Sequence, residues 1–179
     1  MRTEEGNLSL FVAIDRTSKF AYAELHEQYG KMEAAQFLRT LIATVPYTIH
    51  TILTDTGIPF TTRQTDRYAF PPIFARVCLE HDTAHRLTKP NHPWTNGQVE
   101  RMNRTRKEAT VKRDDYENHQ QLREHLSNFL NAYNFAKRLK PLQGLTPYES
   151  SSKAGKTNPN AFSSTQPITK WDSGQADNH

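Results

Sequence analysis

LSLFVAIDRTSKFAYAEL, residues 8–25, is the stretch that decides the fold. Residues 8–15 are apolar and branched enough for a buried β-strand, and residues 20–25 have the composition of a partner strand. The link RTSK has the polar character of a hairpin turn. The stretch therefore predicts a pair of antiparallel strands.

The order of the elements downstream predicts a layered α/β domain. Apolar residues at helical spacing predict a helix over 30–45, and branched residues predict a strand over 49–55. Similar patterns predict, in order, a helix over 71–82, a short strand over 84–88, and helices over 97–112 and 119–139. A hairpin followed by alternating helices and strands favours a mixed α/β architecture over a helical bundle or a β-sandwich.

The size and composition of the chain suggest one domain with an appendage. The chain has 179 residues, and its hydrophobic fraction of 35% is low for a chain that is all core. From Ser150 onward it is polar and rich in Ser, Pro, Gly and Asn. We therefore expect a domain over residues 1–149 and a disordered or interacting tail over 150–179.

The single cysteine and the absence of long apolar runs bear on location. Cys78 has no other cysteine in the chain to pair with, which favours a reducing compartment. No stretch approaches the ~18 apolar residues of a membrane span, and MRTEEGN is not a signal peptide. We expect a cytoplasmic protein with no membrane partner.

Basic residues are concentrated in one segment. Residues 101–113, RMNRTRKEATVKR, carry six Lys and Arg against one Glu. Such a local positive field favours a polyanion such as nucleic acid. A solvated helix face is the alternative explanation and remains open at this point.

Two acids stand out as candidate metal ligands. Asp55 follows a predicted strand, where open α/β sheets place their sites, although the turn TDTG would by itself account for an Asp. Glu100 lies in the first turn of the predicted helix 97–112, where the helix dipole also favours an acid. Glu100, Asn103, Arg104 and Lys107 share one helix face, which suits a divalent ion next to a phosphate backbone.

Four stretches together resemble insertion-sequence transposases related to retroviral integrases. They are FVAIDRTSKFAYAEL, ILTDTGIPF, TKPNHPWTNGQVERMNRTRK and YNFAKRLKPLQGLTPYE, and the resemblance covers residues 8–149. It implies a ribonuclease-H-like mixed sheet flanked by helices, with an Asp, Asp, Glu triad that uses Mg²⁺ or Mn²⁺ to cut and join DNA. It makes Asp55 the second acid and Glu100 the third. The residues expected to contact DNA are Lys89, Asn96, Arg101, Asn103, Arg104, Lys107 and Lys112.

The chain departs from the family pattern at several places. Thr56 stands where Asn is usual and Trp94 where Gln is common. The 44 residues between Asp55 and Glu100 exceed the commonest family spacing, and the excess falls in the predicted loop 61–70.

The first acid of the triad is the largest departure. In the family it lies on a strand that precedes residues 8–15, and residues 1–7 contain no Asp. The resemblance therefore implies a core that is incomplete at its N-terminus and lacks its first, central strand. Asp15 is expected to cap the turn into Thr17 and Ser18, with a role as metal ligand as the open alternative.

The function implied is that of a transposase or integrase catalytic core for DNA strand cleavage and transfer, inactive if the first Asp is missing. Its partners would be transposon ends and target DNA in the bacterial nucleoid, with self-association as in the multimeric family. The alternatives are a non-catalytic, dominant-negative DNA-binding fragment and an inert remnant.

Overall fold

The computed structural model describes residues 1–61, 71–88, 116–157 and 165–168. A short hairpin, β1 (Arg2–Thr3) and β2 (Gly6–Asn7), leads into β3 (Ser9–Ile14) and β4 (Ala21–His26). The last two strands pair antiparallel, from Ser9 opposite His26 to Ile14 opposite Ala21. The predicted strand pair is confirmed to within a residue at each end.

Helix α1 (Lys31–Thr44) covers one face of this hairpin, where residues 30–45 were predicted to be helical. The odd-numbered residues of β3 point to that face, as a period of two requires. Phe11 and Ala13 accordingly join the first hydrophobic core with Phe37, Leu38 and Leu41 of α1. Helix α1 therefore buries this face of the apolar strand β3.

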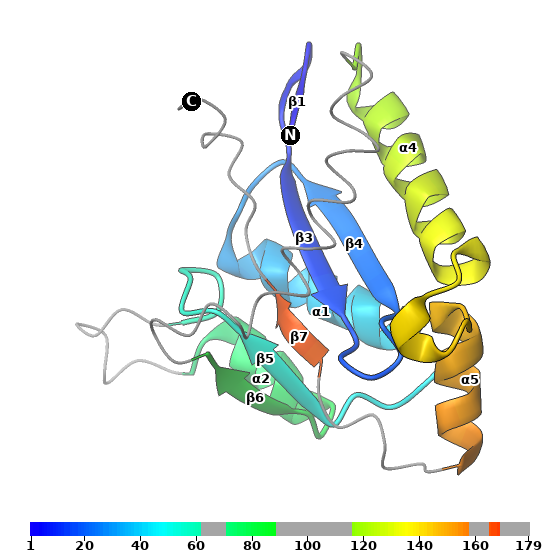
Figure 1. Cartoon of the computed structure of the whole chain (residues 1–179). Coiled ribbons are helices and arrows are strands. Elements are labelled where there is room, and N and C mark those ends of the chain that lie inside the picture. The colour runs from blue at the N-terminus through cyan, green and yellow to red at the C-terminus, as the bar shows by residue number, and fades with distance from the viewer. Residues whose placement is uncertain (62–70, 89–115, 158–164, 169–179) are drawn as a thin grey trace, which may run out of the picture.

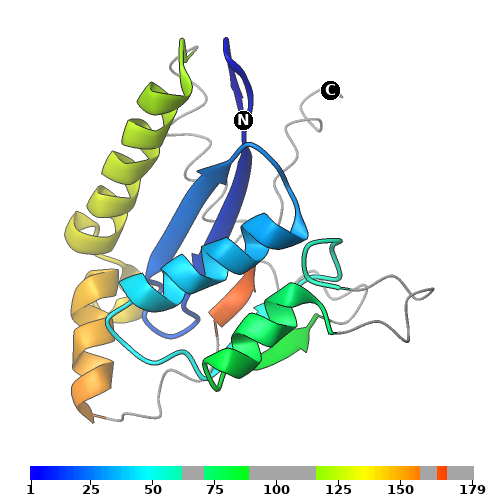
Figure 2. The ribbon, with the colours of Figure 1, turned by 180° about the vertical axis from the view of Figure 1, so that it is seen from behind.

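The second half of the molecule is a parallel unit. β5 (Thr51–Thr54) is followed by α2 (Ile73–Glu80) and β6 (Ala84–Leu87), and β5 and β6 pair in parallel. Helices α1 and α2 lie side by side over the same face of the strands (Figure 2). Ile52, Phe60 and Phe74 belong to the same core as α1, so the two halves share one interior. The strand and helix predicted over 84–88 and 71–82 are confirmed.

A strand that the sequence pattern did not predict lies between β5 and β3. β7 (Thr165–Ile168) pairs in parallel with β5 and lies beside β3 (Figure 1). β7 is the edge strand of the three-stranded sheet β6-β5-β7 and comes from the far end of the sequence, so the expectation that the first strand is missing stays a prediction. Buried backbone N–H and C=O groups need a neighbour, which favours a strand beside β5.

Helix α4 (His119–Asn131) covers the opposite face of the hairpin. The even-numbered residues Leu10, Val12 and Ile14 pack there against Leu122 and Leu126, which form a second core. The predicted helix over 119–139 is shorter than expected. It widens into a π-helical turn, η3 (Ala132–Ala136), before a 3₁₀ turn, η4 (Lys140–Leu142).

Helix α5 (Pro147–Thr157) begins inside the predicted domain and runs past its predicted end at residue 149. Thr146 and Glu149 form a capping box: the Thr146 N–H donates to the Glu149 carboxylate at 2.8 Å and the Glu149 N–H donates to Thr146 Oγ1 at 3.2 Å. Residues 150–157 are thus helical and 165–168 form a strand, and the predicted tail lies otherwise outside the described residues. Capping at the helix start outweighs the weak helix propensity of the polar residues that follow.

Candidate metal and nucleic-acid site

Asp55 lies directly after β5, at the carboxyl end of that strand. Its Oδ1 accepts a hydrogen bond from the Gly57 N–H at 2.8 Å. Burial raises the pKa of the Asp55 carboxyl, and the bond from Gly57 opposes that shift. A half-buried carboxylate of this kind is stabilised by a cation, so Asp55 is suited to be a metal ligand.

Gly57 gives the Asp55 carboxylate room. A Cβ atom at position 57 would lie 2.8 Å from Asp55 Oδ1 and 3.4 Å from the Tyr29 hydroxyl oxygen. The first distance is shorter than a non-bonded contact allows, so any side chain here would displace the carboxylate. Glycine at position 57 therefore lets the Asp55 carboxylate keep this position.

Thr54 and His85 form a rigid support next to Asp55. Thr54 Oγ1 and His85 Nε2 lie 2.8 Å apart, and the His85 ring packs against Phe74 with ring centroids at 5.0 Å. Burial lowers the pKa of His85, so its imidazole is neutral at pH 7. The hydrogen bond between His85 and Thr54 therefore joins two neutral groups. Sequence reasoning did not single out His85. A lone His in a four-residue strand carries no signal that would have done so.

The chain leaves β6 at the edge of the sheet where Asp55 lies. The Thr88 N–H donates to the Thr54 carbonyl at 2.8 Å, which extends the β5–β6 ladder to the residue before Asp55. Glu100 follows twelve residues after Thr88 in the sequence. The predicted helix 97–112 and the other predicted site residues lie outside the described part of the chain; they are Lys89, Asn96, Glu100, Arg101, Asn103, Arg104, Lys107 and Lys112.

Asp15 has a structural role. Its Oδ1 accepts from the Thr17 N–H at 3.1 Å, and its Oδ2 accepts from the N–H at 3.0 Å and from the hydroxyl of Ser18. The residue is 3% exposed. The prediction that Asp15 caps the turn between the strands is confirmed.

Asp15 and Asp55 lie at opposite ends of α1. Asp15 raises the pKa of Tyr47 as a cause secondary to burial, which places it near the residue three positions after α1. The Asp55 turn lies against Tyr29, two positions before α1. The fourteen residues of α1 span about 21 Å at 1.5 Å per residue.

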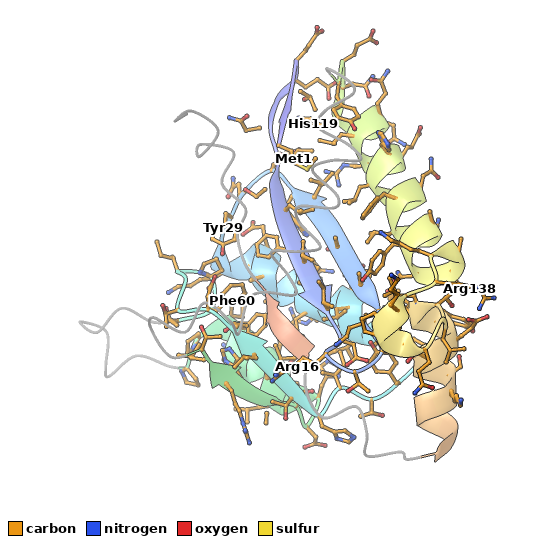
Figure 3. All side chains as sticks on the ribbon, viewed as in Figure 1. Met1, Arg16, Tyr29, Phe60, His119 and Arg138 are labelled. Carbon is orange, nitrogen blue, oxygen red and sulfur yellow. The ribbon has the colours of Figure 1, made fainter. Side chains whose placement is uncertain are left out.

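Figure 3 shows the same separation. Arg16, the residue after Asp15, lies below β7, and Tyr29, which lies against the Asp55 turn, lies above it. Two acids that share a metal centre lie within a few ångströms of each other. The hydrogen bonds of Asp15 lie within its own turn, and its alternative role as a metal ligand stays a prediction. Within the described ranges no three His, Cys, Asp or Glu residues gather closely enough to hold an ion. Asp55 fits a divalent cation as one ligand of a larger set.

Two comparisons with known proteins find similarity to integrases. Residues 81–147 match the family model of the integrase core domain. The catalytic core domain of BIV integrase is similar in structure, with a TM-score of 0.64 and 22% sequence identity over 84% of this chain and 89% of that one. Comparison with curated proteins gives no match.

A second solved structure extends the likeness over nearly the whole chain. It is a chain of the simian T-cell lymphotropic virus intasome in complex with PP2A regulatory subunit B56 gamma. The TM-score is 0.67 at 19% identity, and the match covers 99% of this chain and 57% of the other. None of the described helices is long and apolar enough to cross a membrane. The chain thus has the ribonuclease-H-like fold of integrase catalytic cores, and its residues 81–147 match the integrase core domain.

Proposed function

We propose that the chain binds DNA at the carboxyl ends of β5 and β6 and acts in DNA strand cleavage and transfer during transposition. One observation carries the proposal. Asp55 stands at the sheet edge where β6 ends, and β6 and Glu100 both belong to the segment that matches the integrase core domain.

In this proposal Asp55 and Glu100 are the acids that hold a divalent cation. Mg²⁺ or Mn²⁺ would supply a Lewis acid for the phosphate and an activated water or hydroxyl. The protein's own contribution is to orient the acids. The Gly57 N–H fixes one Asp55 oxygen, and the bonded Thr54–His85 pair anchors the strand behind it.

The basic segment after Glu100 would position the DNA backbone. Six Lys and Arg side chains over 101–113 can each neutralise a phosphate, and Asn96 and Asn103 can donate hydrogen bonds to it. One solved relative is an intasome, and we propose by analogy that this chain also self-associates on DNA.

Nicking of supercoiled plasmid in Mn²⁺ tests the catalytic part of the proposal. Nicks that the unmodified chain makes and that Asp55→Asn and Glu100→Gln abolish would support it. Asp15→Asn is the matched control, because it removes the same charge from a carboxylate that is bonded within its own turn. It should retain activity at a temperature where it is folded.

A non-catalytic DNA-binding module is the second candidate. It is favoured by the observation that, within the described residues, no group of three or more His, Cys, Asp or Glu side chains is placed to hold a metal ion. Plasmid that stays intact while the chain binds DNA would support this candidate and contradict strand transfer by this chain.

A further inference from the structure

The backbone groups of β3 divide between its two edges. The Asp15 N–H donates to the Phe20 carbonyl of the hairpin at 2.9 Å. Successive residues of an antiparallel strand direct their N–H and C=O groups to opposite edges. Phe11 and Ala13 therefore face β4, whereas Leu10, Val12 and Ile14 face the other edge, where β7 lies.

At Leu8, just before β3, this second edge already forms backbone hydrogen bonds. The Leu8 N–H donates to the Met1 carbonyl at 2.7 Å, and its carbonyl accepts from the Met1 amino group. Leu8 belongs to the same alternating set as Leu10, so the edge is already paired at its beginning. The remaining residues of the edge lie beside β7.

The backbone groups of β5 divide in the same way. The Ala84 N–H donates to the His50 carbonyl and the Thr88 N–H donates to the Thr54 carbonyl, each at 2.8 Å. The even-numbered residues of β5 thus face β6, and Thr51 and Leu53 face β7. Leu10, Val12 and Ile14 are at most 2% exposed, so solvent is a poor substitute for a neighbouring strand.

We propose that the space between β3 and β5 is a strand-binding slot, occupied within the same chain by residues 165–168 as an exchangeable central strand. The occupant is a weak one. Pro167 has no N–H to donate, and the pairing with β5 shifts register between Ile52 and Thr54. Within the described residues, strand pairs involving β7 are assigned only to β5.

Strengthening the occupant is the first test, because it avoids variants that fail to fold. Pro167→Val in the full chain restores an N–H and a branched side chain suited to a strand. We expect slower amide exchange, measured by NMR, at Leu10, Val12 and Leu53, and a melting temperature higher by roughly 2–5 °C. Pro159→Val, in the same tail before β7, should change neither.

Weakening the occupant should have the opposite effect. Thr165→Gly combined with Ile168→Gly lowers strand propensity and should speed exchange at Leu10, Val12 and Leu53 by tenfold or more. The amides of Phe11 and Ile52 face β4 and β6 and serve as internal references. The double change to Val at 165 and 168 is the matched control and should preserve protection. Exchange that is unchanged in both the Pro167→Val and the double-Gly chains overturns the proposal.

A cross-link decides whether the strand comes from the same chain. Ile52→Cys and Thr165→Cys sit at partner positions of β5 and β7, and Cys78→Ala removes the native thiol. Oxidation should give a disulfide-linked monomer on a non-reducing gel. Thr165→Cys with exposed Glu124→Cys on α4 should not cross-link. A cross-linked dimer would place the strand of one copy in the slot of another and overturn the same-chain assignment.

Discussion

At the scale of single residues, Asp55 and Asp15 show how one residue type serves two purposes. Asp55 is half-buried with one oxygen bonded by Gly57, and burial raises its pKa above 3.8. Asp15 is buried with both oxygens bonded inside its own turn. Burial therefore destabilises the charged form of the Asp55 carboxyl. The Asp15 carboxylate is instead stabilised by hydrogen bonds from its own turn.

Asp55→Asn should therefore stabilise the folded chain at neutral pH in the absence of metal. The folded pKa of Asp55 lies above its unfolded value, so its favourable contribution is present below pH 3.8 and is lost as pH rises through the folded pKa. The amide keeps the acceptor for Gly57 without the charge. Urea unfolding at pH 7 and pH 3.5 measures the difference, which should shrink at the lower pH.

Mg²⁺ provides the complementary measurement on the same pair. A ligand that binds only the folded state raises the melting temperature by mass action. Millimolar Mg²⁺ should raise it for the unmodified chain and leave Asp55→Asn unchanged. An equal rise in both would show that Asp55 is not a metal ligand.

Asp15→Asn should destabilise the folded chain. Oδ2 accepts from both the N–H and the hydroxyl of Ser18, and an amide NH₂ in that place faces donors. We expect a loss of about 2–3 kcal/mol in the free energy of unfolding, measured by urea titration. A loss below about 0.5 kcal/mol would contradict the capping role.

At the scale of elements, two side chains bind the outer edge of β4. Asn134 of η3 accepts from the Ala21 N–H at 2.9 Å and donates to the Ala21 carbonyl at 2.8 Å. Arg123 of α4 donates to the Leu25 carbonyl at 2.7 Å. These contacts bind the α4–η3 segment to the sheet and occupy an edge that could otherwise pair with another chain.

Asn134→Ala should accordingly loosen the whole α4–η3 segment. It removes two buried hydrogen bonds, and we expect a loss of about 1–3 kcal/mol in the free energy of unfolding. Asn131→Ala, an exposed Asn at the end of α4, is the control and should cost less than about 0.5 kcal/mol. Equal effects from the two substitutions would argue against this role for Asn134.

At the scale of the whole molecule, the basic segment predicts DNA binding that depends steeply on salt. Each phosphate neutralised by a cation contributes about one unit to the slope of log affinity against log salt concentration. Arg104→Ala with Lys107→Ala should therefore reduce that slope by about two, measured by fluorescence anisotropy on duplex DNA. Lys31→Ala with Arg39→Ala, two exposed cations on α1, should leave it unchanged. The reverse pattern would move the DNA-binding face to α1.

Much of this architecture could be predicted from local patterns. The apolar run 8–15, the helical spacing over 30–45 and the branched strand before Asp55 each depend on neighbours in the sequence, and each was found within about two residues. The capping role of Asp15 also depends on residues two and three positions away. Such features are local because side-chain periodicity and turn chemistry act over a few residues.

The tertiary structure alone decided which segments meet. Residues 165–168 contain a proline and follow a polar stretch, so no local pattern marks them as a central strand. They form one because β3 and β5 leave buried backbone groups facing a common space, which is a property of strands 40 residues apart. The separation of Asp15 from Asp55 was likewise decided by the length of α1 between them, since sequence spacing does not say which end of a sheet an acid will face.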